Sequence, residues 1–373
     1  MAYKVYIFAG AHPIYRTLVE YPPDGEFEVV SNISRDAFAQ DRLRVYSSAR
    51  NYVRRIHEVV SEIFGVPRVF VPPPGYDVIH STRGFIPLTK TPTVIDIEIG
   101  TSFTSFSLTA ARRGRWLIRR LLSRESVKYI LPHSRAAMKS FQSLFGREFD
   151  GKLKVVYPAA PVLPCRSAVG RHDSFTILFV GRDAVSKGGI ELYMAFKHLR
   201  REYKNVQLVM KTDPNTLPSS ALRDPHVRII GDMLTYDDVL RLYCNADIFV
   251  MPTHMDSFGY VYLEAMAAGL PLIGTNQFAV PEIIDDGRNG FVISTTLRSH
   301  DDNYLPVYTN PYDYRERERL AKEIAQKIAL LIEDRHLLRK MADYSYYLAT
   351  EGRFSVKYRN EQLRRVYLTA VGD

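Results

Sequence analysis

Short, β-rich apolar runs alternate with helical patterns along this chain of 373 residues. Residues 3–9, 93–97 and 175–180 are strand candidates, and segments with helical spacing of apolar side chains follow them. The alternation predicts an α/β protein whose parallel sheets are covered by helices on both faces. Ligands of such sheets bind beyond the carboxyl ends of the strands, so functional side chains are expected in the turns that follow the strands.

A proline-rich segment divides this pattern into two halves. Residues 157–164 contain three prolines, and the next ten residues are polar. Proline fixes φ and lacks an N–H donor, so the segment is predicted to be a linker. We expect two Rossmann-like, doubly wound domains, 1–165 and 170–352, that face each other across a cleft where the ligand binds. A final helix, at about residues 355–373, can pack back on the first domain.

Two carboxylates, Asp256 and Glu264, straddle a small turn and the start of an apolar helix in the second half. An acid such as Glu264 in a buried helix costs several kcal/mol unless a partner compensates it. It is therefore a candidate for accepting hydrogen bonds from two sugar hydroxyls. The alternatives are a core helix in which a backbone donor satisfies Glu264, and a turn or N-cap role for Asp256.

The turn after the strand at 175–180 carries two fixed cations, Arg182 and Lys187, between glycines and before a helix. A diphosphate fits this arrangement, because arginine gives bidentate contacts, lysine gives a point charge and the helix N-terminus gives free N–H groups. Two solvated surface charges are the alternative.

Together these motifs resemble those of retaining glycosyltransferases of family 4, the glycosyl transferases group 1, which have the GT-B fold. The family pattern has two glutamates separated by seven residues and followed by Ala-Met-Ala-x-Gly-x-Pro; here Asp256 and Glu264 precede residues 265–271. The loop with Arg182 and Lys187 resembles the family's diphosphate loop. Residues 231–234 resemble its nucleobase loop, and the resemblance extends over about residues 175–292.

The resemblance implies a nucleotide-diphosphate sugar as donor, a glycan or lipid-linked acceptor, and neither a metal nor a cofactor. It assigns catalysis to Asp256, Arg182, Lys187 and Glu98. It assigns donor binding to Glu264, Ser257, Phe258, Gly259, Gly181, Gly231, Met233, Leu234 and Gly10. Cations and dipoles of this kind stabilise the charge that develops on a leaving phosphate.

The chain departs from the family pattern at three places. Asp256 is one methylene shorter than the usual glutamate, a single Gly10 stands where a Gly-Gly pair is common, and Glu98 aligns with a family histidine. These departures keep two other hypotheses open. One is a degenerate nucleotide-sugar-binding subunit of a glycan assembly complex, and the other is a nucleotide-sugar epimerase on the same fold.

The net charge of +9 is concentrated in one predicted helix. Residues 111–128 contain seven basic residues and one acid, and the only tryptophan, Trp116, falls among them on the polar side. This pattern favours contact with an anionic membrane surface or with the acceptor. The predicted contact residues are Arg112, Arg115, Trp116, Arg119 and Arg120. The alternatives are a helix exposed to solvent and a helix that contacts a polyanionic glycan. Nucleic-acid binding is not supported, because no nucleic-acid-recognition motif accompanies the charge.

Composition predicts a cytoplasmic location, peripheral on the inner membrane face if the basic helix docks there. No apolar run approaches the 18 residues of a membrane span, and the run near the N-terminus is too short for a signal peptide. The two cysteines, Cys165 and Cys244, suit a reducing compartment and are not expected to form a disulfide framework.

Overall fold

The computed structural model describes residues 2–10, 12–33, 59–163, 165–170, 174–231, 234–307 and 313–372. The chain divides into two compact units. The first consists of Met1–Ala159, Asp302–Pro306 and Val356–Asp373, and the second of Ala160–Asp301 and Val307–Ser355. The first change of unit therefore falls inside the proline-rich segment.

The first unit is built on a five-stranded parallel sheet in the order β2-β1-β4-β6-β7. Its strands are β1 (Tyr3–Phe8), β2 (Phe27–Ser31), β4 (Val78–Ser81), β6 (Thr93–Ile97) and β7 (Val127–Pro132), and β3 (Val69–Phe70) pairs with β5 (Ile86–Pro87) beside it. Ile7 lies opposite His80, and Ser81 lies opposite Ile95. The turns after β1, β4, β6 and β7 consequently meet at one edge of the sheet.

The helices of the first unit cover the two faces of this sheet. They are η1 (Pro13–Tyr15), α1 (Arg16–Glu20), η3 (Gly100–Thr104), α4 (Leu108–Arg113), α5 (Arg115–Leu122), α6 (Arg135–Phe145), η4 (Asp150–Lys152) and α14 (Val356–Val371). Because side chains alternate along β6, Ile95 and Ile97 face the core that Ile118 and Phe141 complete. Asp96 points the other way, where Tyr367 of α14 lies.

The single helix predicted over 103–123 is wrong, because the segment forms η3, α4 and α5. η3 ends at Ser105, whose φ of 54° is left-handed. Gly114 separates α4 from α5, and a Cβ placed on it would lie 1.8 Å from the carbonyl oxygen of Gly65. The close approach of these two glycines fixes the break. Of the helix predicted over 47–64, only residues 59–64 are described, and they are helical.

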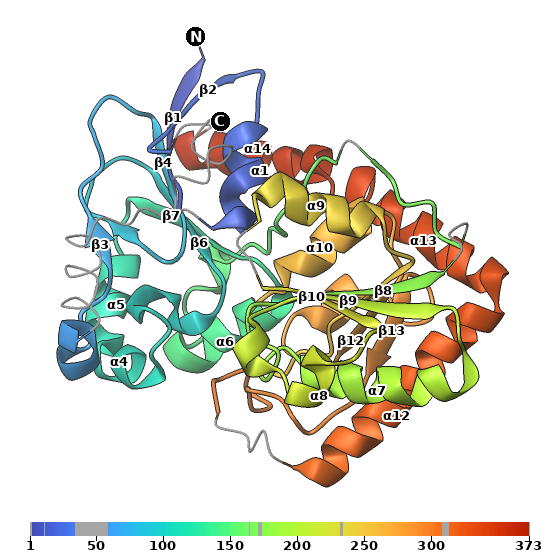
Figure 1. The fold of residues 1–373 in the computed structure, drawn as a ribbon. Helices are drawn as coiled ribbons and strands as arrows, with labels where there is room; N and C mark the ends of the chain where they lie inside the picture. Colours follow the sequence, from blue (N-terminus) through green and yellow to red (C-terminus); the bar gives the residue numbers. More distant parts are fainter. Residues whose placement is uncertain are drawn as a thin grey trace. The chain divides into compact units, whose positions relative to one another are not determined.

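The second unit contains a six-stranded parallel sheet in the order β10-β9-β8-β11-β12-β13. Its strands are β8 (Phe175–Val180), β9 (Val206–Lys211), β10 (Val227–Ile230), β11 (Ile248–Val250), β12 (Leu272–Thr275) and β13 (Gly290–Ile293). Its helices are α7 (Gly189–Glu202), η5 (Pro214–Thr216), α8 (Ser219–Leu222), α9 (Tyr236–Cys244), α10 (Tyr260–Ala267), α11 (Val280–Ile283), α12 (Tyr314–Glu333) and α13 (Arg335–Thr350). Figure 1 shows α7 and α12 on one face of this sheet and α9 and α10 on the other.

Both units are Rossmann-like, so the predicted fold class is confirmed. In each unit the strands are parallel and helices alternate with them, which is the doubly wound arrangement. Among the described residues, no helix is both long and apolar enough to span a bilayer.

The expectation for the cysteines is wrong. Cys165 and Cys244 form a disulfide within the second unit, with Cα atoms 6.1 Å apart, and they are 79 residues apart in the sequence. Spacing alone does not reveal such a pair, because the fold brings the last residue of α9 to the linker. The cysteines therefore give no support to the reducing compartment predicted from their number.

Candidate active site

The turn after β8 is shaped by Asp183. Its carboxylate accepts hydrogen bonds from the N–H groups of Val185 (3.0 Å) and Ser186 (3.1 Å). Burial would raise the pKa of Asp183, but these bonds and the nearby Lys187 outweigh it and hold the pKa below its usual range. The carbonyl of Asp183 also accepts from the N–H of Lys187 at 3.0 Å. The turn is thus a fixed loop that presents Lys187.

Gly188 joins this turn to α7. Its φ is +76°, and a Cβ on it would lie 2.1 Å from the carbonyl oxygen of Pro252. A left-handed φ and this close approach both require glycine. The approach brings the turn after β8 against the segment that follows β11.

Lys187 and Asp256 meet across these two segments. The Lys187 Nζ lies 2.7 Å from Asp256 Oδ2 and donates to the carbonyl of Met255 at 2.5 Å. The N–H groups of His254 and Met255 both donate to the carbonyl of Ser186, at 2.9 and 3.2 Å. The structure therefore brings together two motifs that the sequence separates by 69 residues. The Arg182 side chain, on the same turn, is exposed and has no ion-pair partner among the described residues.

Asp256 also organises the turn before α10. Its Oδ1 accepts from the N–H of Phe258 at 3.3 Å, and its carbonyl accepts from the buried Gln277 side chain at 3.2 Å. Gly259, with φ at 86°, is the N-cap residue of α10. Asp256 is thus a turn acid, as one alternative predicted, and at the same time the partner of Lys187.

Glu264 is 3% exposed, and tyrosine hydroxyls satisfy its carboxylate. Tyr236 donates to Oε1 at 2.8 Å and Tyr243 to Oε2 at 2.7 Å. Burial, and then the charge of Glu264, raise the pKa of both tyrosines well above the usual value, so both hydroxyls keep their protons. A carboxylate has about four lone-pair positions, and these two tyrosines donate to two of them. Side-chain hydroxyls are thus donors to this carboxylate, where the core-helix alternative expected a backbone donor.

Sequence reasoning missed a buried ionic group behind the site. Glu191, in the first turn of α7, is fully buried, and its Oε1 lies 2.8 Å from Arg317 Nε and 3.3 Å from His254 Nε2. The other ring nitrogen of His254 lies 3.0 Å from the carbonyl oxygen of Leu297. These contacts fix the residue that precedes Met255 and Asp256. The signal in the sequence was an acid at an apolar position of α7.

The other predicted donor residues lie at the same edge of the second sheet. Gly181 follows β8, exposed Gly231 follows β10, and half-buried Leu234 precedes α9. Ser257 lies in the turn before α10. Met233 lies outside the described residues.

Gly10 and Glu98 belong to the first unit. The N–H of Gly10 donates to Thr82 Oγ1 at 2.9 Å, and Glu98 Oε1 accepts from the Tyr15 hydroxyl at 2.9 Å. Both residues lie at the edge where the parallel strands of the first sheet end.

A buried cluster around Asp96 supports this edge. Asp96 Oδ1 lies 2.8 Å from His80 Nε2, and Oδ2 lies 3.6 Å from His133 Nε2. Burial would raise the pKa of Asp96, but the two histidines together lower it below its usual range. His80 and His133 are 0% and 3% exposed, so both are core residues.

The predicted membrane-contact residues lie on α4 and α5. Trp116 is 69% exposed, and Ile118 and Leu122 on the opposite side are fully buried. Arg112, Arg115 and Arg120 are exposed, the Arg120 guanidinium lies 5.6 Å from the centre of the Trp116 ring, and Arg119 pairs with Glu148.

Comparison with known proteins identifies the class of this site. Residues 174–300 match the family Glycosyl transferases group 1, and this stretch contains the turns with Lys187 and Asp256 as well as Glu264. Over this stretch the chain is thus similar to glycosyl transferases group 1, and its two Rossmann-like units match those of GT-B structures. The predicted family resemblance is confirmed at this level.

Relatives agree with this assignment over part of their length. The chain is 33% identical over 165 residues to spore coat protein SA of Bacillus subtilis (strain 168), a match over 41% of this chain and 40% of that protein. It is 29% identical over 205 residues to the capsular polysaccharide biosynthesis glycosyltransferase CapM of Staphylococcus aureus, over 53% of this chain and 47% of that protein. The chain thus spans less than half the length of these two relatives.

A solved structure is similar over nearly the whole chain. Anabaena HepE, determined in complex with UDP and glucose, superimposes with a TM-score of 0.61 at 17% identity, over 98% of this chain and 100% of that one. At this identity the likeness establishes the fold.

Proposed function

We propose that the protein is a retaining glycosyltransferase that moves a hexose from a nucleotide-diphosphate sugar to a glycan or lipid-linked acceptor. The bond between the anomeric carbon and the diphosphate oxygen breaks, and a bond from that carbon to an acceptor oxygen forms on the same face. The acceptor proton goes to the departing diphosphate oxygen, so atoms and charge balance without a metal or a cofactor.

The proposal gives a role to each of the site residues predicted to bind charge or hydroxyl groups. Lys187 and Arg182 neutralise the charge that develops on the leaving diphosphate. Glu264 accepts hydrogen bonds from the two ribose hydroxyls. Asp256, held 2.7 Å from the Lys187 ammonium, accepts from hydroxyls of the transferred sugar. Glu98 of the first unit accepts from a hydroxyl of the sugar or of the acceptor.

The observation that carries the proposal is the contact between Lys187 and Asp256. Two loops that follow different strands hold a cation and an anion side by side, 24% and 19% exposed, near the N-terminus of an apolar helix with a buried acid. A diphosphate next to a polyol needs such a pair, because one partner meets the phosphate charge and the other accepts hydroxyl hydrogen bonds.

A nucleotide panel tests the donor assignment. We expect one of GDP, UDP and ADP to bind selectively in calorimetry, and UDP is the first to try because HepE was determined with UDP and glucose. Lys187→Ala should abolish that binding, and Lys322→Ala, an exposed lysine of α12, should not.

The outcomes of the panel separate the alternatives. Selective binding followed by acceptor-dependent turnover supports the transferase. Turnover of the nucleotide sugar without an acceptor would indicate the epimerase. Binding with no turnover would indicate the degenerate subunit, and binding that survives Lys187→Ala would contradict the site assignment.

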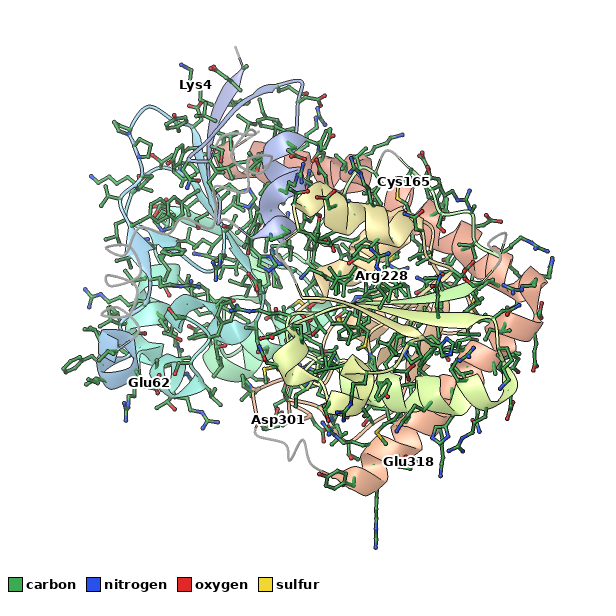
Figure 2. All side chains as sticks on the ribbon, viewed as in Figure 1. Lys4, Glu62, Cys165, Arg228, Asp301 and Glu318 are labelled. Carbon is green, nitrogen blue, oxygen red and sulfur yellow. A yellow bond between two sulfur atoms is a disulfide. The ribbon has the colours of Figure 1, made fainter. Side chains whose placement is uncertain are left out.

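We also propose that the basic surface of α4 and α5 docks on an anionic membrane. The structure adds apolar side chains that the sequence pattern did not assign to this surface, because Gly65 contacts Gly114 and Arg113 donates to the carbonyl of Glu62 at 2.5 Å. These contacts attach the helix at residues 59–64 to the junction of α4 and α5 (Figure 2, Glu62). In this helix the side chains of Ile63 and Phe64 are 54% and 70% exposed. Exposed apolar side chains beside exposed arginines are typical of an interfacial contact.

Vesicle sedimentation tests this docking surface. At low salt the full chain should sediment with vesicles of equal parts phosphatidylglycerol and phosphatidylcholine, and not with pure phosphatidylcholine. Exchanging Arg112, Arg115 and Arg120 for glutamine should weaken binding by about 10²-fold, since each basic residue contributes about 1 kcal/mol near an anionic surface. The same exchange at the exposed Arg223, Arg228 and Arg241 of the second unit is the matched control. Absence of sedimentation at low salt would rule the docking out.

A further inference from the structure

The turn between β4 and β5 holds an arginine in a conformation that arginine rarely adopts. Arg83 has φ at +58°, in the left-handed region. A bulky side chain is strained there and keeps this conformation only where the surroundings impose it. Strain of this kind is concentrated at functional sites.

The surroundings do impose this turn. The N–H of Gly84 donates to the carbonyl of Asp96 at 2.8 Å, and the N–H of Phe85 donates to the carbonyl of Thr82 at 3.2 Å. Gly84 has a φ of +70°, and a Cβ on it would lie 2.7 Å from the backbone carbon of Ser102. Buried Arg68 donates to the carbonyls of both Arg83 and Ser102. The turn is thus fastened to the residues that follow β6.

The Arg83 side chain extends from this turn over Gly10. Its Cδ lies 2.5 Å from where a Cβ of Gly10 would be, and a ring carbon of Tyr15 lies 3.6 Å from the same position. The glycine at position 10 is therefore needed to make room for the arginine. Gly10 is itself fixed by its hydrogen bond to Thr82, the neighbour of Arg83.

Among the described residues, the guanidinium of Arg83 has no hydrogen-bond or ion-pair partner. Its Nε is buried and makes no hydrogen bond, and across the described ranges no carboxylate forms an ion pair with Arg83. Other arginines of the same unit have a protein partner for at least one nitrogen, although Arg68 Nε, like Arg83 Nε, makes no hydrogen bond. Arg68 donates to two carbonyls, and Arg124 donates to the carbonyl of Leu121 at 3.0 Å. A half-buried charge without a partner is costly, so a ligand is the expected partner.

The nearest polar side chains suit a ligand at this place. Tyr15 donates to Glu98 at the same edge of the sheet. Burial, the charge of Glu98 and that of Asp96 raise the pKa of Tyr15, and the charge of Arg83 opposes them, so the cation acts on this group. The cation of Arg83, the carboxylate of Glu98 and the fixed backbone of Gly10 all lie in the turns at this edge of the first sheet.

We propose that Arg83 anchors an oxyanion subsite in the first unit, which takes a phosphate or carboxylate group of a substrate. The proposal rests on the proposed function, because it deepens the assignment of the first unit to substrate binding. The planar guanidinium binds such groups through two parallel N–H bonds. The oxyanion comes either from the donor's diphosphate or from an anionic group on the acceptor.

Inorganic phosphate is the probe for this subsite. Because Lys187 also binds phosphate in the proposed function, titrations use full-length Lys187→Ala protein with and without Arg83→Gly, and the arginine Nε–H resonances are followed by NMR. We expect a saturable shift of the resonance that Arg83→Gly removes, and phosphate binding at least about 10-fold weaker in Arg83→Gly. Arg364→Gln, in the same unit and paired with Glu26, is the matched control.

Arg83→Gly keeps the test independent of folding. Glycine adopts a φ of +58° without strain, so the melting temperature should be unchanged or higher while phosphate binding is lost. Phosphate binding that survives in Arg83→Gly would overturn the proposal, as would the absence of any phosphate-dependent shift.

A UDP titration of Arg83→Gly in the background with intact Lys187 then identifies the source. Weaker UDP binding would assign the subsite to the donor's diphosphate, and unchanged UDP binding would assign it to the acceptor. Failure of every nucleotide to bind would refute the proposed function. The phosphate titration would still test the Arg83 subsite, because it does not depend on nucleotide binding.

Discussion

Lys187→Ala is expected to lower the rate of sugar transfer by about 10²–10³-fold, the usual cost of removing one preorganised group that stabilises developing negative charge. Lys187 is positioned before any ligand arrives, because its N–H is bonded to Asp183 and its ammonium contacts Asp256 and Met255. The substitution also leaves Asp256 without its cation next to the sugar. Both effects weaken binding of the transition state more than they disturb the fold.

The measurement is release of nucleotide diphosphate from the donor that the binding panel identifies. Lys187→Arg retains the charge and should recover part of the rate, although its planar head does not reproduce the contact to the Met255 carbonyl. Lys322→Ala should behave like the unmodified protein. Full activity of Lys187→Ala would remove the diphosphate loop from the site.

The local parts of this site could be predicted from the sequence. A strand followed by glycines and two cations signals an anion-binding turn, and an acid inside the apolar run of α10 signals a buried carboxylate. Each signal is contained within a few neighbouring residues, so no knowledge of the tertiary fold is needed. The parallel sheets could be predicted for the same reason, since β-rich and helical patterns alternate along the chain.

The partners of these groups could not be predicted, because the fold supplies them. Tyr236 and Tyr243 precede Glu264 by 28 and 21 residues and lie in α9. The sequence pattern of this helix does not distinguish them from other helix residues. The Cys165–Cys244 disulfide and the contact between Gly65 and Gly114 also join distant segments. Nothing in the run Thr-Arg-Gly at residues 82–84 indicates that Arg83 is left-handed.

Glu264→Gln is expected to weaken binding of the nucleotide by about 10–100-fold. Hydrogen bonds to a charged acceptor contribute about 1.5–3 kcal/mol each, and the neutral amide keeps the size of the side chain but offers only one acceptor atom. Calorimetry with the selected nucleotide measures the loss. A 2′,3′-dideoxy nucleotide, which lacks both ribose hydroxyls, should bind equally weakly to both proteins.

The control for Glu264 is Tyr243→Phe. This change removes the hydroxyl that donates to Oε2 at 2.7 Å in the fully buried part of the group. It should lower the free energy of unfolding by about 1–3 kcal/mol, because a buried carboxylate oxygen loses its donor. Nucleotide affinity should change little, since the charge of Glu264 remains.

The two variants decide between a purely structural role of Glu264 in the core and a role in binding the ribose. If the carboxylate serves the core alone, Glu264→Gln and Tyr243→Phe should both lower stability and leave nucleotide binding unchanged. If it holds the ribose, only Glu264→Gln should weaken nucleotide binding, and the dideoxy nucleotide should remove the difference between it and the unmodified protein. The tyrosines explain how one buried carboxylate can satisfy both demands: their two hydroxyls hold it in place, and in the proposal the ribose hydroxyls donate to the same carboxylate.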